Sequence, residues 1–174
     1  MGGVEGEVRG FLGPYAEGLV AGCLRRGFVV VVGDGLCNFA VLLALTGGFS
    51  GLPEAPGLSG DLVWYASFAV ACVRKGSITH RILVEGVRRA YGSYTDVDII
   101  ITRRSGPGSV CDSYFYKLKP GSDPEAVARE VVEGNLDQMV RYVMEEAEGM
   151  RVEGLCRGRR DCARMAVELK SHQR

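Results

Sequence analysis

The sequence predicts an α/β protein with a mixed sheet of about five strands, flanking helices and a C-terminal helical extension. The unbroken run Phe28–Val32, rich in β-branched residues, is typical of a strand buried on both faces, and Val97–Thr102 predicts a further strand. Apolar residues recur at helical spacing in residues 77–91 and again in residues 123–148. The chain therefore combines buried strands with amphipathic helices.

The first third of the chain alternates between these patterns. Residues 15–26 have the apolar periodicity of a short helix, and the strand 28–32 follows. Gly33-Asp34-Gly35 predicts a tight turn, and the apolar run Phe39–Leu45 predicts a second strand. Residues 47–60 are rich in Gly, Pro and Ser, so we expect a loop there.

The remaining elements complete the sheet and then the extension. In chain order, we expect a strand at 62–73, a helix at 77–91 with Thr79 as a cap, strands at 97–102 and 110–118, a long helix from Asp123 and a short helix near 161–170. This order divides the chain into a sheet-containing part, residues 1–122, and a helical extension, residues 123–174.

The composition is that of an ordinary globular protein. Of the 174 residues, 47% are hydrophobic and 24% are charged, which excludes a disordered or fibrous chain. The longest apolar run has 7 residues, whereas a membrane-spanning helix needs about 20. Glu5 and Glu7 stand where a secretory signal would have a basic region. We therefore expect a cytoplasmic protein.

The charges are distributed unevenly although the net charge is zero. Residues 1–60 carry −2, residues 61–122 carry +4, residues 123–149 carry −6 and residues 150–174 carry +4. A basic middle and a basic tail suit a protein that meets a polyanion on one face. Ordinary solvated helices would give the same distribution, so both interpretations stay open.

The six cysteines form no CxxC pair, and the chain has only two histidines, so a zinc site is not expected. We expect Cys23, Cys37, Cys72 and Cys111 to be small buried hydrophobic residues. Cys156 and Cys162 are close enough in sequence to form a local disulfide, which the cytosol of a hyperthermophile would tolerate.

Gly33-Asp34-Gly35 follows a strand, as a dinucleotide-binding loop would, but Asn38 replaces the third glycine of that motif. The loop also leads into the predicted strand at Phe39, so no helix N-terminus is expected for a phosphate. A plain turn is favoured. Binding of a small nucleotide through this turn, by a stand-alone α/β protein, is the alternative function.

Acid–base constellations are scarce. His80 lies in the first turn of the helix 77–91, and His172 lies near the end of the chain. Asp96 and Asp98 share a strand face by the two-residue period, and solvated acids at a strand entry explain them. The residues alone indicate no catalytic site.

The basic residues of the middle segment alternate with tyrosines. They are Arg74, Lys75, Arg81, Arg88, Arg89, Arg103, Arg104, Lys117 and Lys119, interleaved with Tyr91, Tyr94, Tyr114 and Tyr116. Guanidinium groups and aromatic rings stack on RNA bases, and Lys and Arg neutralise phosphates. The pattern fits an RNA-binding surface or a general basic surface.

From Leu24 to Lys119 the order of short motifs resembles the C-terminal nuclease-fold domain of the archaeal tRNA-splicing (tRNA-intron) endonucleases. The segments that carry the resemblance are Arg26-Gly27-Phe28-Val29-Val30, Asn38-Phe39-Ala40-Val41-Leu42, Tyr65-Ala66-Ser67-Phe68-Ala69-Val70, Val87-Arg88-Arg89-Ala90-Tyr91-Gly92-Ser93-Tyr94-Thr95, Val97 to Ile101 and Tyr114-Phe115-Tyr116-Lys117-Leu118. In the family these positions carry an RG-F/Y-V-V strand, a D-F-x-V-Y segment, an H-A-x-Y/F-L-V strand, an Arg-to-Lys stretch, an apolar strand and a closing Y-Y-x-V strand. The resemblance implies a nuclease-like mixed sheet in residues 1–122, with the N-terminal domain of the family reduced.

The catalytic positions of the family are replaced in this chain. The family uses a Tyr as general base, a His as general acid and a Lys to stabilise the charged phosphorane. Leu42, Tyr65 and Thr95 stand at those positions. A Leu cannot accept a proton and a Thr cannot neutralise a charge, so the resemblance implies a chain with no catalytic residues, metal or cofactor of its own.

Heterotetrameric members of the family contain two catalytic and two non-catalytic subunits, and this chain resembles the second kind. The implied partners are the catalytic subunit and a precursor tRNA with a bulge–helix–bulge motif, which the complex cuts to leave a 2′,3′-cyclic phosphate. Arg88 matches the family arginine that clamps a bulge base. We expect RNA contacts from Arg88, Arg89, Arg103 and Arg104, and a subunit interface at Tyr114, Phe115, Tyr116 and Leu118.

Overall fold

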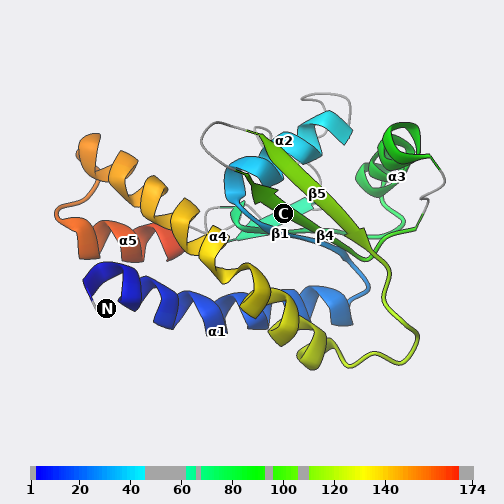
Figure 1. Ribbon diagram of the computed structural model, residues 1–174, viewed down its shortest axis with the longest axis horizontal. Coiled ribbons are helices and arrows are strands. Elements are labelled where there is room, and N and C mark those ends of the chain that lie inside the picture. Colours follow the sequence, from blue (N-terminus) through cyan, green and yellow to red (C-terminus); the bar gives the residue numbers. More distant parts are fainter. Residues whose placement is uncertain (1–2, 46–61, 66–67, 93–95, 106–109, 169–174) are drawn as a thin grey trace.

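The computed structural model describes residues 3–45, 62–65, 68–92, 96–105 and 110–168. It has an α/β architecture in three layers, with a mixed sheet between two layers of helices (Figure 1). The elements are α1 (Gly3–Arg25), β1 (Val29–Gly33), α2 (Gly35–Leu45), β2 (Leu62–Tyr65), β3 (Val70–Val73), α3 (Ile78–Tyr91), β4 (Ile99–Arg104), β5 (Cys111–Tyr116), α4 (Pro124–Val152) and α5 (Arg159–Glu168). The predicted α/β class is confirmed.

The strand order is β2-β3-β1-β4-β5. β1 and β4 are parallel, and β3, β2 and β5 are added antiparallel to their neighbours. Every residue of β1 is buried, because helices cover both faces of this central strand. The prediction that the valine run forms a strand buried on both faces is therefore confirmed.

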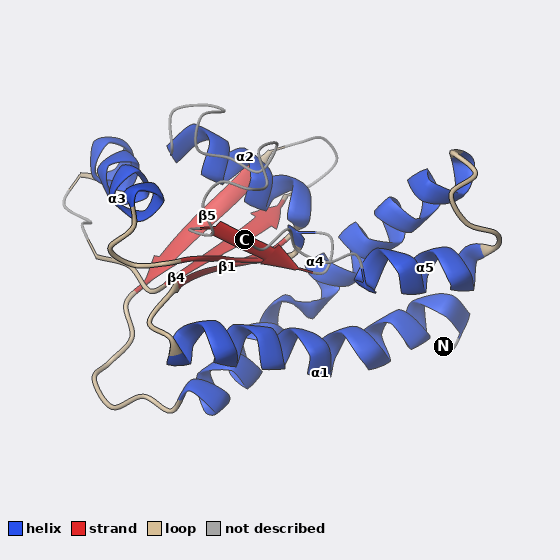
Figure 2. Cartoon of the chain, turned by 180° about the vertical axis from the view of Figure 1, so that it is seen from behind, coloured by secondary structure: helices blue, strands red, loops and turns tan. Residues whose placement is uncertain are grey.

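The two helical layers bury separate core clusters. One face of the sheet packs against α1, α4 and α5, and the other against α2 and α3 (Figure 2). Alternate residues of β1 supply the two clusters, with Val30 and Val32 on the first face and Val29 and Val31 on the second. The predicted extension thus shares a core with the sheet, since Met139 of α4 lies in the same cluster as Val30.

The strand predicted at Phe39–Leu45 is wrong, because these residues form the second half of α2. A short apolar run does not distinguish a buried strand from a buried helix. Asp34 decides the outcome: its Oδ1 accepts hydrogen bonds from the backbone N–H groups of Leu36 (3.0 Å) and Cys37 (3.2 Å) and so caps the helix.

The other elements agree with the prediction in kind and differ in detail. The helix expected at 15–26 is longer and begins at Gly3, and the single strand expected at 62–73 is the antiparallel pair β2 and β3. Ser77, and not Thr79, caps α3, because its side chain accepts a hydrogen bond from the His80 N–H. The loop expected at 47–60 lies outside the described residues.

All six cysteines are paired, which corrects the expectation that four of them are free buried residues. The disulfides are Cys23–Cys72, Cys37–Cys111 and Cys156–Cys162. The first joins α1 to β3, and the second joins α2 to β5, so both connect a helical layer to the sheet. The local pairing of Cys156 with Cys162 is confirmed.

Candidate functional site

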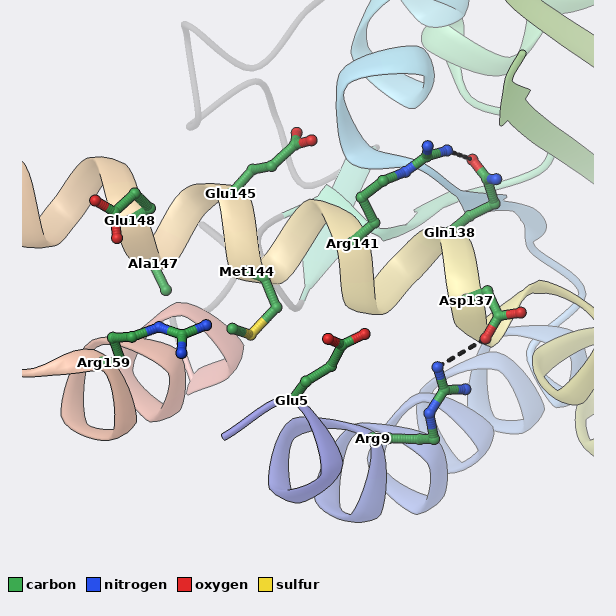
Figure 3. Close-up of a pocket in the computed structure, with 10 residues that line it drawn as sticks. All are labelled: Glu5, Arg9, Asp137, Gln138, Arg141, Met144, Glu145, Ala147, Glu148 and Arg159. Atoms are coloured by element: carbon green, nitrogen blue, oxygen red, sulfur yellow. Dashed lines mark hydrogen bonds and ion pairs between the residues drawn. The ribbon is translucent and has the colours of Figure 1, made fainter. Parts of the chain in front are cut away.

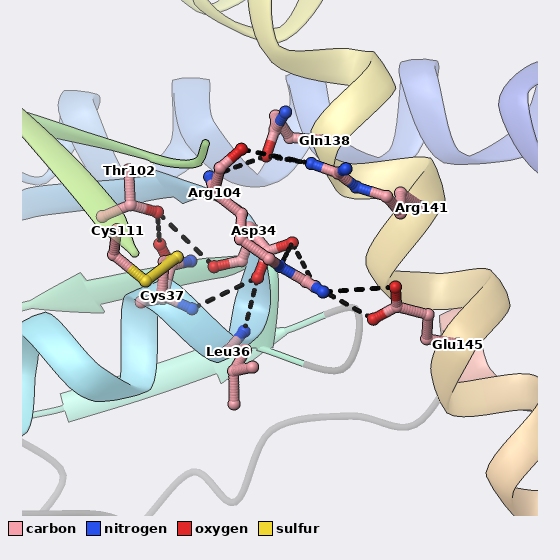
Figure 4. A network of polar contacts seen from close by, with 10 residues as sticks. Asp34, Leu36, Cys37, Thr102, Arg104, Cys111, Gln138, Arg141 and Glu145 are labelled. Atoms are coloured by element: carbon pink, nitrogen blue, oxygen red, sulfur yellow. Dashed lines mark hydrogen bonds and ion pairs between the residues drawn. A yellow bond between two sulfur atoms is a disulfide. The ribbon is translucent and has the colours of Figure 1, made fainter. Parts of the chain in front are cut away.

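A network of polar side chains lies at the carboxyl ends of β1 and β4, where the parallel strands meet α2 and α4 (Figure 4). Asp34 is fully buried there and pairs with Arg104, whose Nη2 lies 2.6 Å and whose Nε lies 3.1 Å from Asp34 Oδ2. Arg104 also reaches Glu145 of α4, with Nη2 2.9 Å from Oε1. One guanidinium group therefore joins β1, β4 and α4.

The two carboxylates hold Arg104 in its charged form. Hydrogen bonds to Glu145 and Asp34 raise the pKa of Arg104 above its usual value, although burial opposes this. Gln138 of α4 accepts a further hydrogen bond from the Arg104 backbone N–H (3.0 Å) and one from Arg141 Nη2 (3.0 Å). The network is thus well satisfied by groups of the protein itself.

A second set of buried polar groups lies next to this network and joins α2 to β4 and to the residues before β3. The Asn38 amide donates to the carbonyl oxygens of Phe68 (2.7 Å) and Ala69 (3.0 Å), and Thr102 Oγ1 donates to Asn38 Oδ1. Phe68 has φ of +76°, and the Asn38 amide hydrogen-bonds to the carbonyl of this residue. Asn38 and Thr102 are fully buried. Their hydrogen bonds therefore stabilise the contact of α2 with the sheet and are not available to a ligand.

The Gly33-Asp34-Gly35 turn does lead into a helix, contrary to the sequence expectation. Its first free N–H groups, however, already donate to the Asp34 carboxylate. A Cβ atom on Gly35 would overlap the Tyr142 ring, so this ring covers the turn from α4. The geometry therefore favours a structural turn over the alternative site for a nucleotide phosphate.

A groove of about 620 Å³ lies beside this network, between the first turns of α1 and the helices α4 and α5 (Figure 3). Its lining mixes both signs of charge, and Arg9 pairs with Asp137 across it at 2.7 Å. Glu145 lines the groove and also pairs with Arg104. Because most of its acids have guanidinium partners, the groove does not attract ligands of one charge.

Helix α3 exposes a basic face. Arg81, Arg88 and Arg89 are exposed along it, and Ile78 is 63% and Tyr91 49% exposed. A shallow groove of about 310 Å³ follows this face; it is lined by Ile78, Arg81, Ile82, Glu85 and Arg89. Glu85, the acidic residue of α3, forms an ion pair with Arg88.

The four predicted RNA-binding arginines fall in two places. Arg88 and Arg89 lie on α3, whereas Arg103 and Arg104 lie at the carboxyl end of β4. Adjacent residues of a strand point to opposite faces. Arg103 is exposed and lies 5.7 Å above the Tyr114 ring, while the side chain of Arg104 is only 13% exposed. The structure thus leaves three of the four accessible.

Of the three positions matched to the catalytic triad, Leu42 is the one whose side chain the structure describes. Leu42 is buried in α2, and not in a strand as the resemblance requires. Tyr65 ends β2 and pairs with Val70 of β3. Thr95 lies outside the described residues.

The predicted interface strand, β5, lies at an edge of the sheet. Tyr114 and Tyr116 are 42% and 48% exposed on one face. Phe115 points to the other face, where its ring packs 4.8 Å from that of Tyr91. Leu118 follows the strand and donates its N–H to Asp98 Oδ2 (2.7 Å).

The interpretation of Asp96 and Asp98 as solvated acids is wrong for Asp98, which is nearly buried in a cluster of charged side chains. At the opposite end of β4 from Arg104, the nearly buried Asp98 forms an ion pair with Lys75, and Lys117 pairs with Asp96 at 2.8 Å. Burial would raise the pKa of Asp98, but hydrogen bonds from Lys75 and Leu118 bring it below its usual value. Burial and the nearby Lys75 lower the pKa of His80. The Asp98 partner is 23 residues distant in sequence, so no local pattern indicates it.

No protein family, curated protein or solved structure matches this chain. Within the described residues, no cluster of His, Cys, Asp or Glu suits a metal ion. A search of the same residues finds no helix with the length and apolar content needed to span a membrane.

Proposed function

We propose that this chain is an RNA-binding protein without catalytic residues of its own, and that the outer face of α3 is its principal RNA contact. The observation that supports this most is the exposure of Arg81, Arg88 and Arg89 on one helix with a single acid, Glu85, among them. Arginine contacts phosphates through two parallel hydrogen bonds and stacks on bases.

The apolar residues of α3 support RNA over a simple anion. Ile78 and Ile82 are exposed beside Arg81, and Tyr91, at the end of the helix, is half exposed while its ring also packs against Phe115. Single-stranded and bulged RNA offers unstacked bases that pack on such groups between phosphate contacts. A free phosphate would use the arginines alone.

The RNA that we propose is a precursor tRNA with a bulge–helix–bulge motif, bound in the complex of a tRNA-splicing endonuclease. This assignment rests on the motif order in Leu24 to Lys119, and on Arg88 at the position of the base-clamping arginine. The helix α2 removes one matched segment from the resemblance, because the family has a strand there. The edge position and exposed tyrosines of β5 suit a strand-to-strand contact with the catalytic subunit.

Fluorescence anisotropy with a labelled bulge–helix–bulge hairpin tests the proposal. The double variant R88A/R89A removes two exposed arginines, so the slope of log affinity against log salt should fall by about 1.8. The matched control is R25A/R129A, which removes two exposed arginines of α1 and α4, the helices that pack on the opposite face of the sheet. An unchanged slope for folded R88A/R89A would reject α3 as the RNA contact.

A second measurement separates the wider assignment from RNA binding. Purified alone, the chain should bind the hairpin without cutting it, because Leu42 and the other matched positions cannot supply the base, the acid and the positive charge. Cleavage at the bulges by the isolated chain would exclude the non-catalytic subunit.

A further inference from the structure

A disulfide closes a small ring that joins the end of the α4–α5 connection to the first turn of α5. Cys156 and Cys162 are bonded across six positions of sequence, with Cα atoms 5.4 Å apart. The ring has the sequence Cys156-Arg157-Gly158-Arg159-Arg160-Asp161-Cys162. Gly158 has φ of +64°, a conformation that suits glycine, and allows the chain to turn between the arginines. We call these seven residues the arginine ring.

The arginine ring borders a hollow of about 600 Å³ that is rich in guanidinium groups. Its lining residues are Val4, Arg157, Gly158, Arg159, Arg160, Asp161 and Arg164. The four arginines are all exposed, and Asp161 is the single acid among the lining residues. A concave surface with this charge attracts a polyanion and keeps its counterions close.

Two of the four arginines are held in place by α1. Arg160 pairs with Glu7, with Nε 2.8 Å from Oε1, and Arg164 lies 5.0 Å above the Phe11 ring. Arg164 also lies 3.9 Å from Glu168. Arg157 and Arg159 have no ion pair with any residue that the structure describes. Arg159 also lines the mixed-charge groove, where it lies near Glu148 without an ion pair to it. The ring therefore has two arginines without an ion pair beside two that shape the wall.

We propose that the arginine ring binds the phosphate backbone of RNA, with Arg157 and Arg159 as the direct contacts. The identity of the ligand as RNA rests on the proposed function, and the ring would be a second contact for the same molecule. The disulfide holds the guanidinium groups together before binding, so less conformational entropy is lost when the RNA binds.

An anionic membrane fits this end of the molecule less well than RNA does. Leu155 is 58% and Met165 38% exposed there, which would suit insertion into a bilayer. These two residues, however, share their hollow with Glu145, Glu146 and Glu153. An anionic surface that approached Leu155 would be repelled by these carboxylates, whereas a narrow RNA strand can enter the arginine-lined hollow on its own.

The ring and the face of α3 lie at opposite ends of the long axis of the molecule (Figure 1). The two sites therefore contact different stretches of one RNA and share no side chains. Substitutions at two distant sites have effects on affinity that add. This separation allows each site to be tested in the presence of the other.

The test measures binding of the same labelled hairpin to R157A/R159A between 50 and 200 mM salt. Two lost phosphate contacts should reduce the slope of log affinity against log salt by about 1.8. The affinity of the variant should therefore fall about 10-fold less between 50 and 200 mM salt than that of the unchanged protein. The control R25A/R129A removes the same charge elsewhere and should change the slope less. A melting curve shows that each variant is folded.

A second variant, C156S/C162S, opens the ring and keeps its charges. It should bind the hairpin several-fold more weakly with an unchanged slope, because the number of phosphate contacts is the same but their arrangement is not. An affinity equal to that of the unchanged protein would overturn the role of the disulfide.

The outcomes separate this inference from the proposed function. A lower slope for R157A/R159A with no effect of R88A/R89A would support the ring and reject α3. The reverse result would overturn the ring and leave α3 in place. Binding to phosphatidylserine vesicles that R157A/R159A abolishes, with RNA binding intact, would overturn RNA as the ligand of the ring.

Discussion

Replacement of Asp34 by asparagine should destabilise the protein by about 2–3 kcal/mol. Asparagine keeps the side-chain oxygen that accepts from Leu36 and Cys37, and it caps helices as well as aspartate does. The substitution therefore removes the charge and leaves the cap. Arg104 would remain at 13% exposure with one carboxylate in place of two.

The magnitude follows from the burial of the two partners. Breaking a buried ion pair by removal of one charge costs about 3–5 kcal/mol. Asp34 is fully buried, but Arg104 keeps its contact with Glu145, which is half exposed, so we expect a cost below this range, about 2–3 kcal/mol. In a chain of this length each kcal/mol lowers Tm by about 2–4 °C, and we expect a Tm lower by about 5–10 °C.

Urea unfolding followed by circular dichroism gives the free energy of unfolding for three variants. D34N should lose about 2–3 kcal/mol, and D34A should lose about 1 kcal/mol more because it also lacks the cap. E145Q removes a half-exposed partner of the same arginine and should lose less than about 1 kcal/mol. A D34N protein within about 0.5 kcal/mol of the unchanged protein would refute the reasoning.

Three further predictions concern other parts of the molecule. C37S/C111S should unfold about 4 kcal/mol more easily in denaturant, because this disulfide closes a long loop, with 74 positions between its cysteines; stability equal to that of the unchanged protein would contradict this. The folded pKa of Asp98 lies below its value of 3.8 in the unfolded chain, so its ionised form stabilises the fold above that pH, and this stability is lost as the pH falls through the folded pKa; acid titration of D98N should lack this part of the pH dependence, and an unchanged profile would argue against it. Y116D should disrupt the assembly with a partner chain, since it places a charge on the exposed edge strand; light scattering that shows the full assembly would reject β5 as the interface.

The sequence predicts the elements whose composition favours one kind of secondary structure and fails where a short apolar run fits two. The run Val29–Val32 of β1 favours a strand because all four residues are β-branched, whereas Phe39–Leu45 has Val41 as its single β-branched residue. The run Phe39–Leu45 is equally apolar and is a helix, and only Asp34 before Gly35 signals the cap. Asp34, as a helix-capping residue before this run, favours a helix, and with it the sequence predicts α2.

The contacts of the candidate site depend on tertiary structure. The two-residue period predicts that Arg103 and Arg104 point to opposite faces, but the sequence does not show that both contact α4, Arg103 through Asn135 and Arg104 through Glu145. Asp34 and Arg104 are separated by 70 positions, and Cys37 and Cys111 by 74. Cysteine spacing alone does not give disulfide connectivity. The pairs Asp34–Arg104 and Cys37–Cys111 therefore become predictable only once β1 is known to pair with β4.

The disulfides bear on how the two proposed RNA contacts work together. Cys23–Cys72 joins the layer of α1 and α4 to the sheet, and Cys37–Cys111 joins the layer of α2 and α3 to it. The ring contacts α1 through the Arg160–Glu7 ion pair, and α3 shares a core cluster with α2, so the bonds from α1 and α2 to one sheet favour a fixed separation of the two sites. A fixed separation means that an RNA long enough to reach both ends gains the second contact without a change in the protein. A hairpin too short to reach both sites should then show the salt slope of one site. It can bind either at the arginine ring or at α3, so R157A/R159A should abolish its binding at the ring and R88A/R89A its binding at α3. Equal slopes for the short and the long RNA would mean that a single surface binds both.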